Sequence, residues 1–205
     1  MLKKIVLAAL TAAALTMVAP AMASATGTSI PDPVSGDEQA YLADGDGNPE
    51  HATIGLAGPL SLNSSTGLVI TCQNTATMTV LDDGTAEVTA FNPTGCTTNV
   101  PGCTSSVSPT YLSWGSRDVW DPVTGKYKGR VNLYIDVHLG SGCPVSGTFP
   151  TSGVLSPTKA VSGGIMTATF SGASSGTVSG AIGTSTVSGT LTSTSGVGAD
   201  TQLIH

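Results

Sequence analysis

Apolar and polar residues alternate with a period of two through most of the chain after residue 50, and no window of ten or more residues carries a convincing helical pattern. Residues 67–72 (GLVITC) are typical of a strand, and residues 74–92 (NTATMTVLDDGTAEVTAFN) hold two alternating runs around one turn. Because alternate side chains of a strand point to opposite faces, each run has one face for a core and one for solvent. The pattern therefore predicts an all-β, antiparallel fold.

The hairpin at residues 74–92 also predicts its own register. Asp82, Asp83 and Gly84 form a three-residue loop if Gly84 takes the left-handed conformation that completes a type I turn with a bulge. One face then carries the pairs Val80/Ala86, Met78/Val88 and Ala76/Ala90, and the other carries Thr79/Glu87 and Thr77/Thr89. A two-residue loop would set Val80 against Glu87, so the apolar pairing favours the longer loop.

Four cysteines allow three disulfide patterns. Continuing the hairpin register places Cys72 opposite Thr94 and within reach of Cys96, which leaves Cys103 to pair with Cys143. A zinc site needs closer ligand pairs than Cys96 and Cys103 supply, and a redox site needs a Cys-x-x-Cys, which the chain lacks. We expect two structural disulfides that contribute about 2–4 kcal/mol each.

The first 23 residues have the features of a secretory signal: Lys3 and Lys4, an apolar run, and the small residues Ala21 and Ala23 around Met22. A membrane anchor is the alternative, but the run is short for a hydrocarbon core of about 30 Å. No later run is long enough to span a membrane. We expect a protein that is secreted or extracellular, or held at the cell surface through its folded part. Disulfides fit such an oxidising location.

Residues 24–50 lack a sustained period and are rich in Pro, Gly and carboxylates, so we expect a flexible acidic arm before one domain at 51–205. The segment DGDGNPE (44–50) resembles the start of a calcium loop. However, Pro49 stands where that loop needs Gly, and Gly55 stands where it needs a bidentate Glu. We expect a mobile arm rather than a metal site, and no cofactor. For 51–205 we expect an antiparallel β-sandwich, or a flattened barrel, held by the two disulfides.

Charge limits the partners. The formal net charge is −6, with 7 Lys and Arg against 13 Asp and Glu, so we expect neither nucleic acid nor an anionic lipid surface as partner. Charged residues make up 10% of the chain, below the usual quarter, and Ser, Thr and Gly take over the polar surface.

After Cys143 a Val-Ser-Gly-x-apolar motif recurs four times, within PVSGTF, AVSGGI, TVSGAI and TVSGTL, at uneven spacing that argues against a solenoid. With this tail, the GPLSL (58–62) and LVITCQ (68–73) segments and the paired cysteines, residues 50–205 resemble short exported bacterial β-proteins rich in Thr, Ser and Gly, whose function is unassigned. The resemblance implies a secreted β-sandwich and no particular activity.

Aromatic and basic residues gather in one segment, residues 111–138. It holds both tryptophans, three of the 4 tyrosines, and four of the 7 Lys and Arg. Aromatic faces beside polar side chains suit sugar rings and also protein contacts. Packing in the core is the alternative, which we favour for Trp114 but not for Trp120, because the latter adjoins a turn at Pro122 and Gly125. The expected ligand-binding residues are Trp120, Tyr127, Arg117, Arg130, Tyr134, Asp136 and His138.

Asp136 and His138 lie two apart in an alternating run, so their side chains share a face, as an acid–base pair requires. No Gly-x-Ser-x-Gly elbow accompanies them, and we expect a solvated surface pair rather than a catalytic one. The leading functional hypothesis is a secreted, non-enzymatic module that binds an envelope glycan or a protein partner. The second is a structural, pilin-like or surface-layer subunit that assembles by strand addition. The third is a secreted hydrolase.

Overall fold

The computed structural model describes residues 30–205 except residue 33, and these residues form β-strands with one short 3₁₀ turn. The expected signal segment (1–23) lies outside the described residues. The strands are β1 (Glu38–Gln39), β2 (Tyr41–Ala43), β3 (Ala52–Ser64), β4 (Val69–Val80), β5 (Thr85–Thr98), β6 (Ser105–Pro109), β7 (Trp114–Asp121), β8 (Lys126–Leu139), β9 (Gly147–Leu155), β10 (Thr158–Ser162), β11 (Ile165–Ser171), β12 (Thr177–Gly180), β13 (Gly183–Ser195) and β14 (Gln202–Ile204), with the 3₁₀ turn at Gly172–Ser175.

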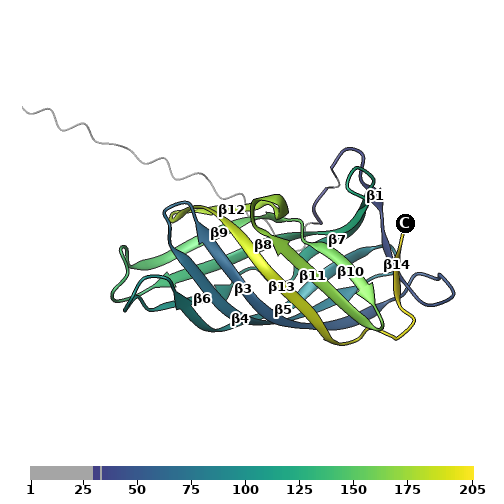
Figure 1. The fold of residues 1–205 in the computed structure, drawn as a ribbon, viewed down its shortest axis with the longest axis horizontal. Coiled ribbons are helices and arrows are strands. Elements are labelled where there is room, and N and C mark those ends of the chain that lie inside the picture. The colour runs from purple at the N-terminus through teal and green to yellow at the C-terminus, as the bar shows by residue number, and fades with distance from the viewer. Residues whose placement is uncertain (1–29, 33) are drawn as a thin grey trace, which may run out of the picture.

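Eight strands close into an antiparallel barrel in the order β3-β4-β5-β7-β8-β10-β11-β13 and back to β3 (Figure 1). The long strands β8 and β13 each pair with two shorter strands in succession along one edge. Along one edge of β8 the neighbours are β7 and β6, and along its other edge they are β10 and β9. Along one edge of β13 the neighbours are β11 and β12. The all-β prediction is confirmed in its barrel form. The two-sheet sandwich is not formed, because the β7–β8 and β3–β13 ladders join the strands into one ring.

The core is the barrel interior. Along β4 the burial alternates without a break, with Ile70, Cys72, Asn74, Ala76, Met78 and Val80 inside. Along β8 the odd-numbered residues Leu133, Ile135, Val137 and Leu139 are buried, as the alternation predicts. Each buried aliphatic side chain contributes about 1.5–3 kcal/mol. The outward positions carry Thr, Ser and Gln, which explains how a chain with few charges covers its surface.

The β4–β5 hairpin follows the predicted register near its turn and departs from it further along. Gly84 has a φ of 75°, and Val80 pairs with Ala86 and Met78 with Val88, as predicted. A bulge then shifts the ladder by one residue, so that Ala76 pairs with Phe91 and not with Ala90. The predicted Thr77/Thr89 pair is wrong for the same reason. Bulges bend strands, and this one brings the Phe91 ring inward to within 5.3 Å of the Trp114 ring centroid.

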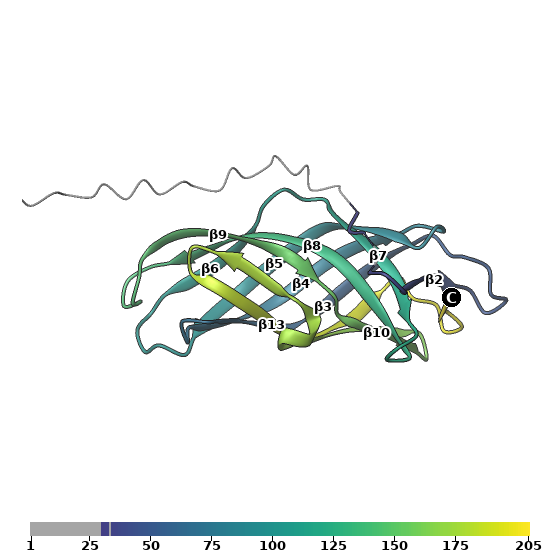
Figure 2. The same ribbon diagram turned by 90° about the horizontal axis from the view of Figure 1, so that it is seen from above.

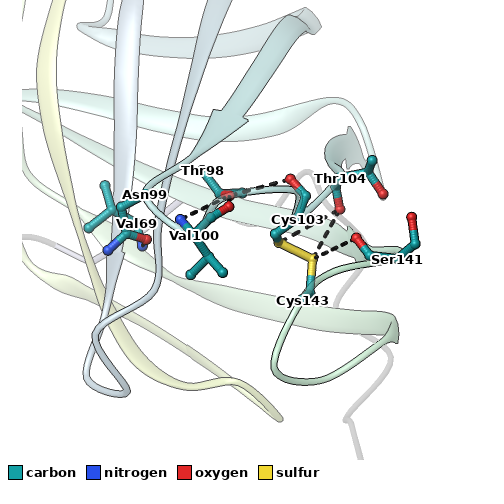
Figure 3. Close-up of a disulfide and its surroundings, with 8 residues drawn as sticks. All are labelled: Val69, Thr98, Asn99, Val100, Cys103, Thr104, Ser141 and Cys143. Carbon is teal, nitrogen blue, oxygen red and sulfur yellow. Dashed lines mark hydrogen bonds between the residues drawn. A yellow bond between two sulfur atoms is a disulfide. The ribbon is translucent and has the colours of Figure 1, made fainter.

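Both predicted disulfides are formed. Cys72–Cys96 crosses the β4–β5 ladder at a second register shift, and Cys103–Cys143 ties the loop after β5 to the loop after β8. Figure 3 shows the second bond beside Thr104 and Ser141. No cysteine of the described residues is free. Two disulfides indicate an oxidising environment.

The N-terminal segment corrects one expectation. Residues 24–50 were expected to form a flexible arm, yet β1 pairs with β7, β2 pairs with β14, and Ala40 and Leu42 are fully buried. The sequence signal was weak because these strands are two and three residues long. Residues 24–29 and 33 lie outside the described residues.

The β2–β14 pair and the C terminus lie together at one end of the barrel (Figures 1 and 2). The acidic loop after β2, residues 44–50, is held by local hydrogen bonds. Asp44 Oδ1 accepts hydrogen bonds from the backbone N–H groups of Asp46 (3.0 Å) and Asn48 (2.9 Å). These bonds, above all those from Asn48, lower the pKa of Asp44.

Candidate functional site

The structure divides the seven expected ligand-binding residues between two faces of the barrel wall. Trp120 pairs with Tyr127 and Arg117 pairs with Arg130 across the β7–β8 ladder. Trp120 follows Trp114 at an even interval and shares its inward direction, whereas Arg117 alternates outward. By the same rule Tyr127 points inward at the barrel end. The outward group is Arg117, Arg130, Tyr134, Asp136 and His138.

The inward pair meets the C terminus at the end of the barrel. The Trp120 and Tyr127 ring centroids are 4.7 Å apart, and the His205 ring stacks on Trp120 at 4.4 Å with an interplanar angle of 10°. Tyr127 Oη also lies 3.2 Å from His205 Nδ1, a hydrogen bond in which either group can donate. Sequence reasoning missed His205, because it is 78 residues from Tyr127 and no periodic pattern connects the two.

An open cleft of about 400 Å³ adjoins these rings, and we name it the mouth cleft. Its lining combines aromatic and aliphatic surface with two lysines, an amide and two hydroxyls: Trp120, Gly125, Lys126, Tyr127, Thr158, Lys159, Ala160, Val161, Gln202 and Leu203. Burial raises the pKa of Tyr127 above its ordinary value.

The β7–β8 turn that presents this cleft is held by Asp121. Its carboxylate accepts hydrogen bonds from the Val123 and Thr124 backbone N–H groups and from the Thr124 hydroxyl, and it pairs with Lys128 Nζ at 2.5 Å. The Lys128 ammonium and the Thr124 hydroxyl hold the pKa of Asp121 far below its ordinary value. The turn predicted at Pro122 and Gly125 is thus confirmed, and the contacts of Asp121 connect it to the strands that carry Trp120 and Tyr127.

On the outer face Arg130 pairs with the N-terminal segment, and Arg117 lies near the β4–β5 turn. Arg130 Nε lies 3.2 Å from Asp37 Oδ2. Asp83 near Arg117 has a lowered pKa, mainly because the Thr85 hydroxyl donates to it, with a smaller contribution from the Arg117 charge. Tyr134 packs edge-on against Tyr111 at 5.9 Å.

His138 is engaged on both sides by hydroxyls. Its Nε2 lies 2.7 Å from Ser108 Oγ and its Nδ1 lies 2.9 Å from Thr148 Oγ1. The shared face of Asp136 and His138 is as predicted, but the two bonds of the imidazole lead to the neighbouring strands β6 and β9. The arrangement ties three strands together.

The second candidate site is inside the barrel, where the sequence analysis named no residue. A cavity of about 110 Å³ is lined almost wholly by apolar side chains, among them Met78, Phe91, Trp114, Ala168 and Phe170. At its mouth-cleft end the Lys159 ammonium pairs with the Asp118 carboxylate, and the two side chains are 4% and 3% exposed. Lys159 lines both the cavity and the mouth cleft.

Gly129 makes room for this ion pair. Asp118 pairs with Gly129 across the β7–β8 ladder, and Lys159 lies one strand further on, opposite Tyr127. The Lys159 side chain therefore crosses over Gly129 to reach Asp118, and a Cβ at Gly129 would lie 2.8 Å from Lys159 Cε. The sequence contains one signal for this pair: Asp118 in β7 and Lys159 in β10 are charged residues at inward-facing positions. That signal can be read only when it is known which face of β7 and of β10 points into the barrel.

No protein-family model matches the chain, and no curated protein or solved structure matches it. In the part of the chain that the structure describes, no helix has the length and hydropathy needed to cross a membrane, and no group of three or more His, Cys, Asp or Glu is arranged to hold a metal ion.

Proposed function

We propose that the chain is an exported, non-enzymatic binding protein whose ligand contacts the mouth cleft. One observation carries the proposal: Trp120 and Tyr127, paired on the neighbouring strands β7 and β8 beside their turn, lie in contact and line an open cleft with polar groups around them. The two disulfides support export, because they suit an oxidising compartment. The signal-like N terminus supports it as well.

The lining favours a glycan of the cell envelope over a protein partner. Sugar rings offer C–H faces to aromatic rings and hydroxyls to hydrogen-bonding groups, and the cleft supplies Lys126, Thr158 and Gln202 beside its two rings. A protein interface requires a broader surface, of about 800 Å² on each partner, than a cleft of this size presents by itself. A protein remains the second occupant to be tested.

His205 sets a condition for this ligand. One face of Trp120 is stacked on His205, so a sugar that stacks there must displace the last residue of the chain. Removal of His205 by a stop codon should strengthen glycan binding, because the competing stack is lost. This variant distinguishes a site on the Trp120 face from a site elsewhere on the barrel.

The direct test uses the mature protein with Trp114→Phe, which leaves Trp120 as the only tryptophan. Titration with soluble envelope oligosaccharides should change the Trp120 emission. Trp120→Ala and Tyr127→Ala, followed by calorimetry, should each weaken binding about thirtyfold, as aromatic hot spots do. Tyr134→Ala is the matched control, because Tyr134 is an aromatic residue of the same strand on the outer face. Equal losses in Tyr134→Ala and Tyr127→Ala would contradict the proposal.

The other two hypotheses have less support. Strand addition requires a free sheet edge, and each of the eight ring strands has a neighbour on both sides, which leaves only short edges among the described residues, such as that of β6, paired with β8 alone. Polymers that grow with concentration in sedimentation experiments would favour strand addition. In a Ser–His–carboxylate hydrolase a carboxylate accepts a hydrogen bond from the second imidazole nitrogen, whereas His138 Nδ1 lies beside the Thr148 hydroxyl. Turnover of an ester, peptide or glycoside panel, lost in His138→Ala, would favour that function.

A further inference from the structure

The ion pair between Lys159 and Asp118 is energetically unfavourable in an apolar interior, because both charges lose their hydration. Removing two charges from water costs several kcal/mol for each ion, and well-packed apolar residues of similar size are often as stabilising or more so. Lys159 and Asp118 are almost completely buried beside a cavity whose lining is mostly apolar. Stability alone therefore does not account for the pair, and buried charges beside a cavity are frequent at functional sites.

The pair leaves one donor available. An ammonium has three N–H groups. Within the described residues, Lys159 Nζ donates to Asp118 Oδ1 and lies 3.9 Å from Met78 Sδ, a weak acceptor. A group in the cavity can therefore accept a hydrogen bond from Lys159 without breaking the ion pair.

The charge balance selects the ligand. Lys159 and Asp118 neutralise each other, so a carboxylate in the cavity would add a third buried charge with no partner of its own. A neutral oxygen adds none. The cavity volume of about 110 Å³ is of the same order as the roughly 150 Å³ cavity that holds benzene in an engineered protein core.

We propose that the barrel interior is a binding site for a small, uncharged, mainly apolar molecule with one acceptor oxygen, such as a cyclic ketone or alcohol, and that Lys159 donates a hydrogen bond to that oxygen. The site goes beyond the function proposed for the mouth cleft and does not depend on it. Trp114 lines the interior and Trp120 lines the cleft, so the two sites have separate reporters.

The test compares three probes of similar shape on the mature protein with Trp120→Phe, in which Trp114 is the only tryptophan. Cyclohexanone should change the Trp114 emission and bind about tenfold tighter in calorimetry than methylenecyclohexane, which lacks the acceptor, because a hydrogen bond from a charged donor is worth about that much. Cyclohexanecarboxylate should bind more weakly than either. Absence of binding by both neutral probes would overturn the proposal and identify the cavity as a packing void.

Variants locate the bound probe. Ala168→Leu fills the cavity and should abolish binding, while Ala173→Leu, at an exposed position of the 3₁₀ turn, should leave it unchanged. If Ala168→Leu does not fold, Ala76→Val fills the same cavity with less added volume. The double variant Asp118→Leu/Lys159→Met removes the donor without leaving a lone charge.

In the double variant both neutral probes should still bind, and the tenfold preference for cyclohexanone should disappear. Retained preference in that variant, or undiminished binding in a folded cavity-filling variant, would overturn the assignment. Failure of the glycan titration at Trp120 leaves these outcomes unaffected, so the two proposals fail separately.

Discussion

The Asp118–Lys159 pair makes a quantitative prediction about folding stability. Lys159→Met replaces the ammonium with an apolar chain of similar length and leaves the Asp118 carboxylate buried, with its side chain 3% exposed. Removal of one partner of a buried pair costs about 3–5 kcal/mol. For a chain of this size each kcal/mol lowers the Tm by about 2–4 °C. The variant should therefore unfold roughly 6–20 °C below the parent protein.

Three further variants complete the measurement. Asp118→Leu should cost a similar amount, because it leaves the Lys159 ammonium buried. The double variant should recover most of the loss, since it leaves neither charge behind. Lys128→Met is the matched control. It also breaks a Lys–Asp pair, but the Lys128 side chain is 26% exposed, so the loss should be much smaller.

The assay is urea unfolding of the oxidised mature protein, followed by circular dichroism and repeated by calorimetry. A double variant as unstable as the sum of the two single variants would show that the charges are not coupled. A Lys159→Met protein with the unfolding midpoint of the parent would show that the pair is not buried in solution. Either result would refute the reasoning, and with it the basis for a donor inside the barrel.

Three other predictions follow from the fold. Leu42→Ala should lower the free energy of unfolding in urea by about 2–5 kcal/mol, because Leu42 is fully buried at the barrel end. The control Val34→Ala, at a residue 51% exposed, should lower it by almost nothing. Equal effects of the two variants would mean that the N-terminal segment does not pack on the barrel. Trp114→Ala should cost about 3–5 kcal/mol, and a stable variant would contradict its place in the core. The folded pKa of Asp121 lies below its ordinary value of 3.8, so its contribution to stability is present above that pH and is lost as pH falls below it. The Tm of Asp121→Asn should consequently be lower than that of the parent at neutral pH and fall less on acidification, and parallel Tm curves in calorimetry would exclude this role.

Local patterns of the sequence predicted much of the wall. The alternation along 70–80 and 133–139 predicted which side chains are buried, whereas Asn132, which it places on the polar face, is buried as well. The Asp82–Gly84 loop predicted the register next to it. Both predictions depend on neighbours a few residues away. The disulfide of Cys72 with Cys96 was inferred by extending that register. It is formed, although Thr94 pairs with Gln73 and not with Cys72 as predicted. Trp120 and Tyr127 were singled out as candidate ligand-binding residues because aromatic residues are scarce in this chain and gather around one turn.

The features that depend on how the eight strands close into a barrel were decided by the tertiary structure alone. The bulge that turns Phe91 inward, the short strands β1 and β2 and the stack of His205 on Trp120 arise from contacts between distant segments, which no local period reports. The same holds for Lys159 and Asp118, which are 41 residues apart. Alternation determines that neighbouring residues lie on opposite faces. Only closure determines which face becomes the interior, and it alone places these two charges together inside the barrel.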